Sequence, residues 1–291
     1  MTPVAVIDIG TNTTRLLVAE LEYGKVVELE RRTTITRLGQ DVDATGRLAD
    51  EAMDRVAKAI AEYREVIDHL GAEPVVAVAT SAMRDSENGP DFRDRLQERY
   101  RVDARTISGD EEARLTFLGA TAGRRADREL VVIDIGGGST EYVAGAAGQD
   151  PSFHASTQMG SVRFTERFLK GDPPGKREME ELAEAIRETV PDVTAEHAVA
   201  VAGTATSLAA IDGAEEVHGY RLSLDSCERI AAMLAGKTVE ERRGVPGLHP
   251  DRAPTIVAGA LILTESIRSL GLSEVEVSDR DILHGAALSV S

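Results

Sequence analysis

The chain has 291 residues, of which 42% are hydrophobic and 3% aromatic, with no Trp and one Cys. This length favours two domains, and cores of Val, Ile, Leu and Ala are typical of helix-covered parallel sheets. The formal net charge of -17 argues against nucleic acid or an anionic membrane as the main partner, because the summed field repels both.

Other compositional features narrow the class further. The single Cys227 excludes an intramolecular disulfide, and the chain opens on a strand-like run without a basic leader. The apolar run IVAGALIL from Ile256 is far shorter than the ~20 residues of a membrane helix. The histidines lack a metal-ligand spacing such as His-Glu-x-x-His. We therefore expect a soluble cytoplasmic protein without a histidine or thiolate zinc site.

The first half of the chain predicts the order β-β-β-α-β-α-β-α. A helix between Asp50, as N-cap, and Gly71, as stop, follows from apolar residues that recur at intervals of three and four. These residues are Met53, Val56, Ile60, Tyr63, Ile67 and Leu70. The other predicted elements are strands at 4–9, 14–22, 25–36, 74–80 and 103–107, a short helix near 91–100, and a helix that opens at GDEEARLTFLGA.

A polar segment that begins at Gly123 marks the predicted domain boundary. We place an N-terminal domain at 1–124, a C-terminal domain at 125–291, and a candidate hinge near 123–129. The last helix, 279–291, is a candidate to pack back on the N-terminal domain. The second half predicts strands at 130–135, 140–146, 151–159, 198–203 and 274–277, helices near 160–170 and 176–188, and a helix that starts at TATSLAAI.

The two halves share a motif. VAVIDIGTNTTRLLVA begins at Val4 and VVIDIGGGSTEYV begins at Val131. An offset of 126 residues (134 minus 8) places Asp8 on Asp134 and Gly10 on Gly136. An aspartate within an apolar strand costs free energy to bury unless it has a partner. The recurrence of this aspartate in both halves indicates that a functional domain was duplicated.

Each repeated strand ends at a glycine turn that could bind phosphate. Backbone N–H groups and small hydroxyls in such turns suit an anion, and two such loops facing each other across a cleft would hold a phosphate chain from both sides. The residues are Gly10, Thr11, Asn12 and Thr13 in the first copy and Gly136, Gly137, Gly138 and Ser139 in the second. Ordinary tight hairpin turns are the alternative. A third turn, Gly203 and Thr204, opens a helix and is either a phosphate site or a plain strand-to-helix connection.

The order of five motifs resembles that of the Ppx/GppA family, the exopolyphosphatases and guanosine pentaphosphate phosphatases. The motifs are DIGTNTTRLLVAE, ATSAMRD, ISGDEEARLTFLGA, DIGGGSTEYV and AGTATSLAA. The chain most resembles the short actinobacterial-type members. The resemblance implies an α/β fold of two duplicated ribonuclease H-like (actin-like ATPase) domains that flank an interdomain cleft. It also implies Mg²⁺ (or Mn²⁺) as cofactor and a homodimer.

The resemblance also assigns roles to individual residues. It implies that Glu112 orients the attacking water, although acidic residues at a helix start are also favoured by the helix dipole. Asp134 and Glu141 match positions associated with the metal, and Asp8, the counterpart of Asp134, is expected to act similarly through water. Arg84 matches a family arginine suited to phosphate oxygens, with a solvated surface role as the alternative.

One motif departs from the family pattern. The family commonly ends with Ser-Asp, three residues and Arg-Glu-Gly, whereas this chain has Leu283 and His284 before Gly285. The expected activity is Mg²⁺-dependent release of orthophosphate from the end of inorganic polyphosphate, with short chains preferred. The alternatives are a guanosine pentaphosphate phosphohydrolase, a kinase of the same superfamily, and a non-catalytic sensor that binds polyphosphate or guanosine polyphosphates.

Overall fold

The structure is a computed structural model that describes residues 2–125 and 129–290. The chain forms two compact units. Unit 1 comprises Met1–Gly123 and Asp281–Ser291, and unit 2 comprises Arg124–Arg280. Unit 2 is therefore an insertion in the sequence of unit 1. Of the predicted hinge, residues 126–128 lie outside the described residues.

Unit 1 is built on a mixed sheet with the strand order β3-β2-β1-β4-β5. Strands β1 to β3 form an antiparallel ribbon, and β4 and β5 extend it in parallel with β1. The strands are β1 (Val4–Ile9), β2 (Thr13–Glu22), β3 (Lys25–Ile35), β4 (Val75–Ala79) and β5 (Ala104–Thr106). The helices are α1 (Val42–Thr45), α2 (Asp50–Leu70), α3 (Ser81–Arg84), α4 (Gly89–Tyr100), α5 (Gly109–Thr121) and α12 (Ile282–Leu288).

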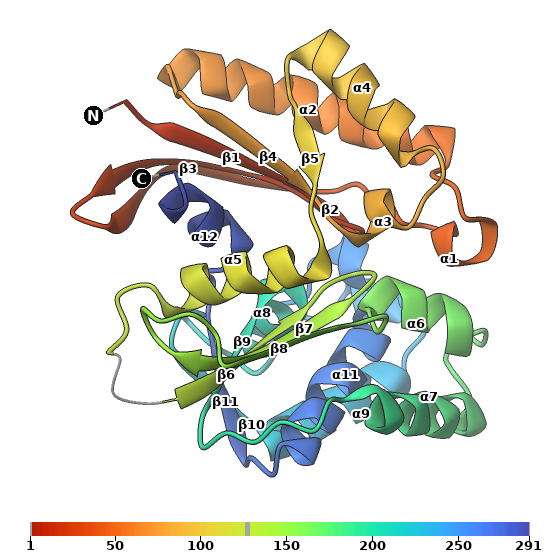
Figure 1. Ribbon diagram of the computed structural model, residues 1–291. Coiled ribbons are helices and arrows are strands. Elements are labelled where there is room, and N and C mark those ends of the chain that lie inside the picture. The colour runs from red at the N-terminus through yellow and green to blue at the C-terminus, as the bar shows by residue number, and fades with distance from the viewer. Residues whose placement is uncertain (1, 126–128, 291) are drawn as a thin grey trace. The chain divides into compact units, whose positions relative to one another are not determined.

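Strand β1 is buried on both faces, which explains its nearly continuous apolar sequence. Ala5 and Ile9 lie in the apolar cluster formed with α2, whereas Val4 and Val6 lie in the cluster formed with α12. Figure 1 shows α2 and α4 together on one face of the sheet. Because side chains alternate along a strand, Asp8 continues the series of Val4 and Val6. Its carboxylate therefore belongs to the face that α12 covers.

Helix α2 confirms the predicted apolar stripe. Met53, Val56, Ile60, Tyr63 and Ile67 are buried, and Leu70 is partly buried against the same cluster. The helix ends at Gly71, which has the left-handed φ of 61° that favours glycine. At the other end the N-cap is Ala49, and Asp50 is the first helical residue. The aspartate thus faces the helix dipole without capping it through its side chain.

Helix α12 is shorter than the predicted 279–291 and lies against α5 at very close range. A Cβ atom on Gly285 would lie 1.8 Å from the carbonyl oxygen of Leu115, and one on Gly119 would lie 1.9 Å from that of Asp281. Leu283 is fully buried in the cluster that contains Val4. In this chain, position 283 is a core position of unit 1, and α12 fixes the placement of α5.

Unit 2 repeats the topology of unit 1 on a sheet with the order β10-β11-β9-β6-β7-β8. Strands β6 to β8 form the antiparallel ribbon, and β9 and β11 continue in parallel with β6. The strands are β6 (Glu129–Ile135), β7 (Thr140–Ala146), β8 (Phe153–Thr157), β9 (Ala198–Val201), β10 (Tyr220–Ser223) and β11 (Glu274–Val277). The predicted α/β fold of two duplicated ribonuclease H-like domains is therefore confirmed.

The helices of unit 2 supply most of its core. Strand residues such as Ile133, Ala200 and Val277 share one apolar cluster with α8, α9 and α11. The helices are α6 (Ser161–Phe168), α7 (Lys176–Thr189), α8 (Ala202–Ile211), α9 (Leu224–Ala235), α10 (Val239–Arg243), the 3₁₀ helix η1 (Pro250–Arg252) and α11 (Ile256–Ser269). Strand β10 was not predicted from the sequence.

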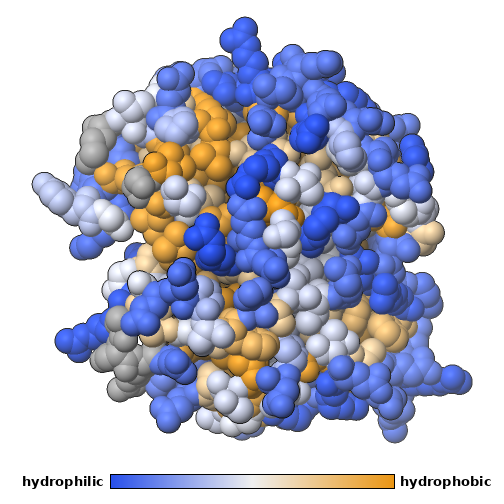
Figure 2. Space-filling view, viewed as in Figure 1, coloured by the Kyte–Doolittle hydropathy of each residue, from blue (hydrophilic) through white to orange (hydrophobic). Residues whose placement is uncertain are grey.

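The face of the molecule seen in Figure 2 is mostly hydrophilic, in line with a chain in which 29% of the residues are charged. Within residues 2–125 and 129–290, no helix has the length and apolar character needed to cross a membrane.

Gly285→Ala tests the contact between α12 and α5. The added methyl group would overlap the carbonyl of Leu115, so we expect a loss of about 1–3 kcal/mol or more in the free energy of unfolding. Thermal unfolding measures this loss. The control is Gly236→Ala, because Gly236 has a φ of -77° and its added Cβ would lie 3.6 Å from the nearest atom. Equal melting temperatures for the two variants would contradict the packing described.

Candidate active site

The two repeated strands end in hairpin turns of the same geometry. The N–H of Gly10 donates to the carbonyl of Thr13 at 2.9 Å, and the N–H of Gly136 donates to the carbonyl of Ser139 at 3.0 Å. A Cβ atom on either glycine would lie 3.0 or 3.1 Å from the same carbonyl oxygen. The tight turn therefore favours glycine at the end of each strand.

In the first hairpin, the rest of unit 1 binds the carbonyl groups. The carbonyl of Thr11 accepts from Gly39 N at 2.8 Å, and that of Asn12 accepts from the N–H groups of Thr36 and Arg37 at 3.0 Å. The Thr11 hydroxyl bonds to that of Ser81. Among the described residues, the N–H groups of Thr11 and Asn12 make no hydrogen bond. These amides are available to an anion.

The second hairpin is held in the same way by the start of α6. The carbonyls of Gly136 and Gly137 accept from Ser161 N at 3.0 Å and Val162 N at 2.8 Å. The carbonyl of Gly138 accepts from Arg163 Nε at 2.8 Å. In the described part of the chain, neither Gly137 nor Gly138 donates its N–H group. Both hairpins thus have anchored carbonyls and open amides, an arrangement suited to phosphate oxygens.

The cross-strand neighbour of the aspartate is positively charged in unit 1 and negatively charged in unit 2. In unit 1, Asp8 is the cross-strand partner of Arg15. In unit 2, Asp134 is the cross-strand partner of Glu141. The offset of 126 residues that matches Asp8 to Asp134 also matches Arg15 to Glu141. The duplicated hairpins therefore keep one backbone geometry but differ in the charge beside the aspartate.

In unit 1, Arg15 connects Asp8 to the start of α12. Its Nε and Nη2 donate to Asp8 Oδ2 at 2.9 and 2.7 Å, and its Nη1 donates to Asp281 Oδ2. Asp281 also caps α12 by accepting from Leu283 N at 3.1 Å, and Arg31 lies 3.8 Å from its carboxylate. Burial acts to raise the pKa of Asp281, but Arg15 and Arg31 outweigh burial and lower the pKa. Burial raises the pKa of Asp8, and Arg15 offsets only part of that effect.

In unit 2, Asp134 and Glu141 bring two carboxylates together. Direct cross-strand partners have Cβ atoms about 4.5–5.5 Å apart. The two residues are 7% and 1% exposed, and Glu141 Oε1 accepts from the Ser156 hydroxyl at 2.7 Å. Within residues 2–125 and 129–290, no group of three or more His, Cys, Asp or Glu side chains could hold a metal. Mg²⁺ commonly uses only one or two carboxylates, with water and substrate oxygens as further ligands. This pair therefore fits Mg²⁺.

Glu112 and Arg84 meet in unit 1. Glu112 lies in the first turn of α5 and is 8% exposed. Arg84 Nη1 donates to Glu112 Oε2 at 3.2 Å and to the carbonyl of Ile107 at 3.0 Å. The neighbouring Glu111 instead pairs with Arg105 at 2.6 Å and is more exposed. Helix position alone does not distinguish the two glutamates, but their surroundings do.

The third predicted phosphate turn lies at the start of α8. The strand was predicted to extend to Gly203, but the structure begins α8 at Ala202. Ala202 has a left-handed φ of 63°. A Cβ atom on Gly203 would lie 1.9 Å from Nη1 of Arg252, so the guanidinium rests on this turn. The Thr204 side chain is 4% exposed and faces Gly259 of α11. Sequence reasoning missed Arg252, because no pattern links it to a turn 49 residues earlier (252 minus 203).

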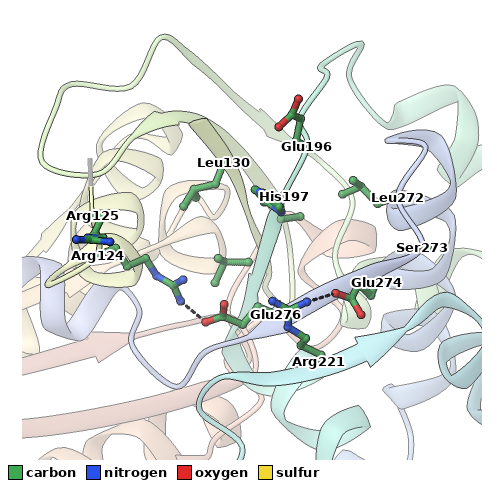
Figure 3. A pocket seen from close by; sticks show the side chains of 12 residues that line it. Arg124, Arg125, Leu130, Glu196, His197, Arg221, Leu272, Ser273, Glu274 and Glu276 are labelled. Atoms are coloured by element: carbon green, nitrogen blue, oxygen red, sulfur yellow. Dashed lines mark hydrogen bonds and ion pairs between the residues drawn. The ribbon is translucent and has the colours of Figure 1, made fainter. Parts of the chain in front are cut away.

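A cavity of about 470 Å³ lies elsewhere in unit 2 (Figure 3). Charged residues line it, and they include the ion pairs Arg124–Glu276 at 2.5 Å and Arg221–Glu274 at 2.6 Å. It opens beside the first residues of β6 and β9. Leu130 is five residues before the end of β6 at Ile135, roughly 16 Å along the strand at about 3.3 Å per residue. Ligands of open α/β sheets bind at the carboxyl ends of strands, where the hairpins lie. None of the predicted site residues lines this cavity.

Comparisons with known proteins show which family the chain belongs to. The profile of the Ppx/GppA phosphatase family matches residues 17–290. This chain belongs to the Ppx/GppA phosphatase family. Exopolyphosphatase 2 of Mycobacterium tuberculosis is 38% identical over 100% of this chain and 99% of its own length. Exopolyphosphatase 1 of the same species is 32% identical over 97% of this chain and 86% of its own length.

A solved structure agrees with the family assignment. The Ppx/GppA family member of Aquifex aeolicus has a TM-score of 0.83 and 30% identity, over 99% of this chain and 97% of its own. Family membership and full-length similarity to named exopolyphosphatases make this chain a hydrolase.

Asp281→Asn tests the buried charges around Arg15. Asn retains the ability to cap α12 but removes the negative charge, so we expect a loss of about 3–5 kcal/mol in the free energy of unfolding at pH 7. Because the pKa of Asp281 is lowered in the folded state, its contribution is present above about pH 4 and is lost as the pH falls further. The difference between variant and wild type should therefore shrink below about pH 4. Denaturant unfolding at several pH values measures it.

Asp68→Asn provides the matched control in the same unit. Asp68 pairs with Arg64, but its side chain is 60% exposed, so we expect a loss of at most about 1 kcal/mol. A pH-independent effect of Asp281→Asn would contradict the assignment of the charge.

Proposed function

We propose that this chain is an exopolyphosphatase that hydrolyses the terminal phosphoanhydride of inorganic polyphosphate with Mg²⁺ and releases orthophosphate. The paired carboxylates of Asp134 and Glu141, next to the open amides of Gly137 and Gly138, carry the proposal. Full-length similarity to proteins named exopolyphosphatase supports the substrate class.

Unit 2 contributes the metal site in this proposal. Asp134 and Glu141 would hold Mg²⁺, and the Ser156 hydroxyl, which donates to Glu141 Oε1, orients that carboxylate. Bound Mg²⁺ would stabilise negative charge on the phosphate that is transferred. The amides of the second hairpin bind oxygens of that phosphate, since preorganised N–H donors stabilise charge that develops in the transition state. Arg252, on the turn at Gly203, adds a positive charge in the same unit.

Unit 1 contributes the residues that activate water. Glu112 aligns the attacking water and accepts a proton from it. Arg84 Nη1 donates to the Glu112 carboxylate and holds it in place. Among the described residues, Arg84 Nη2 makes no hydrogen bond, and it can bind a phosphate oxygen. The amides of Thr11 and Asn12 bind further phosphate oxygens. In-line attack by the aligned water then breaks the terminal P–O–P linkage.

A preference for short chains follows from electrostatics. The chain carries a net charge of -17, so a long polyanion is repelled wherever local donors do not hold it. The donors identified are confined to the hairpins, Arg84 and the turn at Gly203. We therefore expect the rate to level off at short chain lengths.

Glu112→Gln and Glu111→Gln form a matched pair that tests the proposal. Both remove a carboxylate from the start of α5, but only Glu112 contacts Arg84. We expect Glu112→Gln to lower kcat by about 10²–10⁴-fold, the usual contribution of general base catalysis. Glu111→Gln should stay within about threefold of wild type. The measurement is the rate of orthophosphate release with Mg²⁺. The substrates are short polyphosphate, long polyphosphate, guanosine pentaphosphate and ATP.

The substrate panel separates the alternatives. Fastest release from short polyphosphate supports the proposal. Fastest release from guanosine pentaphosphate would replace it with a nucleotide phosphohydrolase, and binding without release from any substrate would indicate a sensor. Equal losses in the two glutamate variants would overturn the role of Glu112.

A further inference from the structure

Arg242 is a buried cation that lacks a carboxylate partner. The residue is 3% exposed. Its Nε donates to the carbonyl of Leu234 at 2.8 Å, and its Nη1 donates to the carbonyl of Ala253 at 3.4 Å. Among the described residues it makes no ion pair, and its buried Nη2 has no hydrogen-bond partner. Because a buried charge without an ionic partner costs free energy, the stability of unit 2 alone does not favour an arginine at this position.

The two carbonyl groups that Arg242 binds come from different parts of unit 2. Leu234 stands next to the last residue of α9, at the end of the helix where the dipole favours a cation. Ala253 directly follows η1 and precedes α11. The guanidinium therefore ties the end of α9 to the turn between η1 and α11.

The segment from Arg242 to Arg252 contacts both ends of α8. A Cβ atom on Gly247 would lie 2.5 Å from the carbonyl oxygen of Ala210, close to the last residue of this helix. At the first turn of the helix, the guanidinium of Arg252 rests on Gly203. The segment thus leads from the end of α8 back to the turn that is proposed to bind phosphate.

The carbonyl held by Arg242 is one residue away from Arg252. Inside the turn, Arg252 N donates to the carbonyl of His249 at 2.9 Å, and Thr255 N donates to the carbonyl of Arg252 at 3.0 Å. These bonds fix the shape of the turn, whereas the bond from Arg242 to Ala253 ties the turn to α9. A shift of the Ala253 carbonyl would therefore move the backbone of Arg252.

We propose that Arg242 is a positioning residue for Arg252, and that it sets how the Arg252 guanidinium lies on the phosphate turn at Gly203. This rests on the proposed function, in which that turn helps to bind the phosphate chain. Arg242 acts through the backbone at Ala253, so its effect on substrate binding depends on the presence of Arg252.

A double-mutant cycle of Arg242→Met and Arg252→Met tests this dependence. The measurements are KM and kcat for orthophosphate release from tripolyphosphate with Mg²⁺, and the melting temperature of each variant. We expect Arg252→Met to raise KM about tenfold and Arg242→Met at least about threefold, because a hydrogen bond between charged groups is lost or misplaced. The double variant should lie within about twofold of Arg252→Met, since residues that act through one another are not additive.

Arg243→Met is the matched control. Arg243 follows Arg242 in α10, but its side chain is 48% exposed and pairs with Glu240 at 3.3 Å. Its KM should stay within about twofold of wild type. Arg242→Lys keeps the charge and one donor, so its KM should lie between those of wild type and Arg242→Met. If Arg242→Met does not fold, Arg242→Lys takes its place in the cycle.

The outcomes separate this inference from the function on which it rests. Additive increases in KM, or an increase in Arg242→Met with none in Arg252→Met, would overturn the role of Arg242 while leaving the hydrolase. A wild type that releases no orthophosphate would overturn the proposed function. The same cycle is then measured as the affinity for tripolyphosphate by calorimetry, where additive losses, or no binding by wild type, would overturn the inference.

Discussion

A carboxylate buried at the end of an apolar strand is the constraint from which much of this structure follows. Such a group needs a compensating partner, because an isolated buried charge costs several kcal/mol. Unit 1 supplies Arg15 to Asp8, and Arg15 in turn binds Asp281 at the start of α12. The C-terminal segment is thereby tied to the first strand of the chain. Helix α12 then lies against α5, which carries Glu112.

The two repeated hairpins share one backbone geometry. Both hairpins anchor their carbonyls within their own unit and leave amides open. In unit 2, Glu141 stands where unit 1 has Arg15, so a carboxylate pair suited to Mg²⁺ replaces an internal ion pair. In the proposed reaction, the first copy holds phosphate and aligns water, while the second holds the metal. The cross-strand partner of the aspartate is an arginine in unit 1 and a glutamate in unit 2.

Local sequence patterns were sufficient for the repeated strands, the hairpins and α2. Asp-Ile-Gly marks the strand ends directly, and the apolar stripe of α2 recurs with the helical period. Contacts between distant residues could not be predicted. Arg15 and Asp281 are 266 residues apart, and Arg252 meets Gly203 only through the fold of unit 2. Leu283, which stands where the family pattern commonly has an arginine, packs in the core of unit 1.

The central claim is that water attacks the terminal phosphate of a polyphosphate chain. Hydrolysis of short polyphosphate in H₂¹⁸O, followed by ³¹P NMR, tests this claim most directly, because ¹⁸O shifts the phosphorus resonance. The account predicts that each newly released orthophosphate carries one ¹⁸O atom and that chains shorten from their ends. Orthophosphate without the label, phosphate transfer to another acceptor, or cleavage within the chain would contradict it.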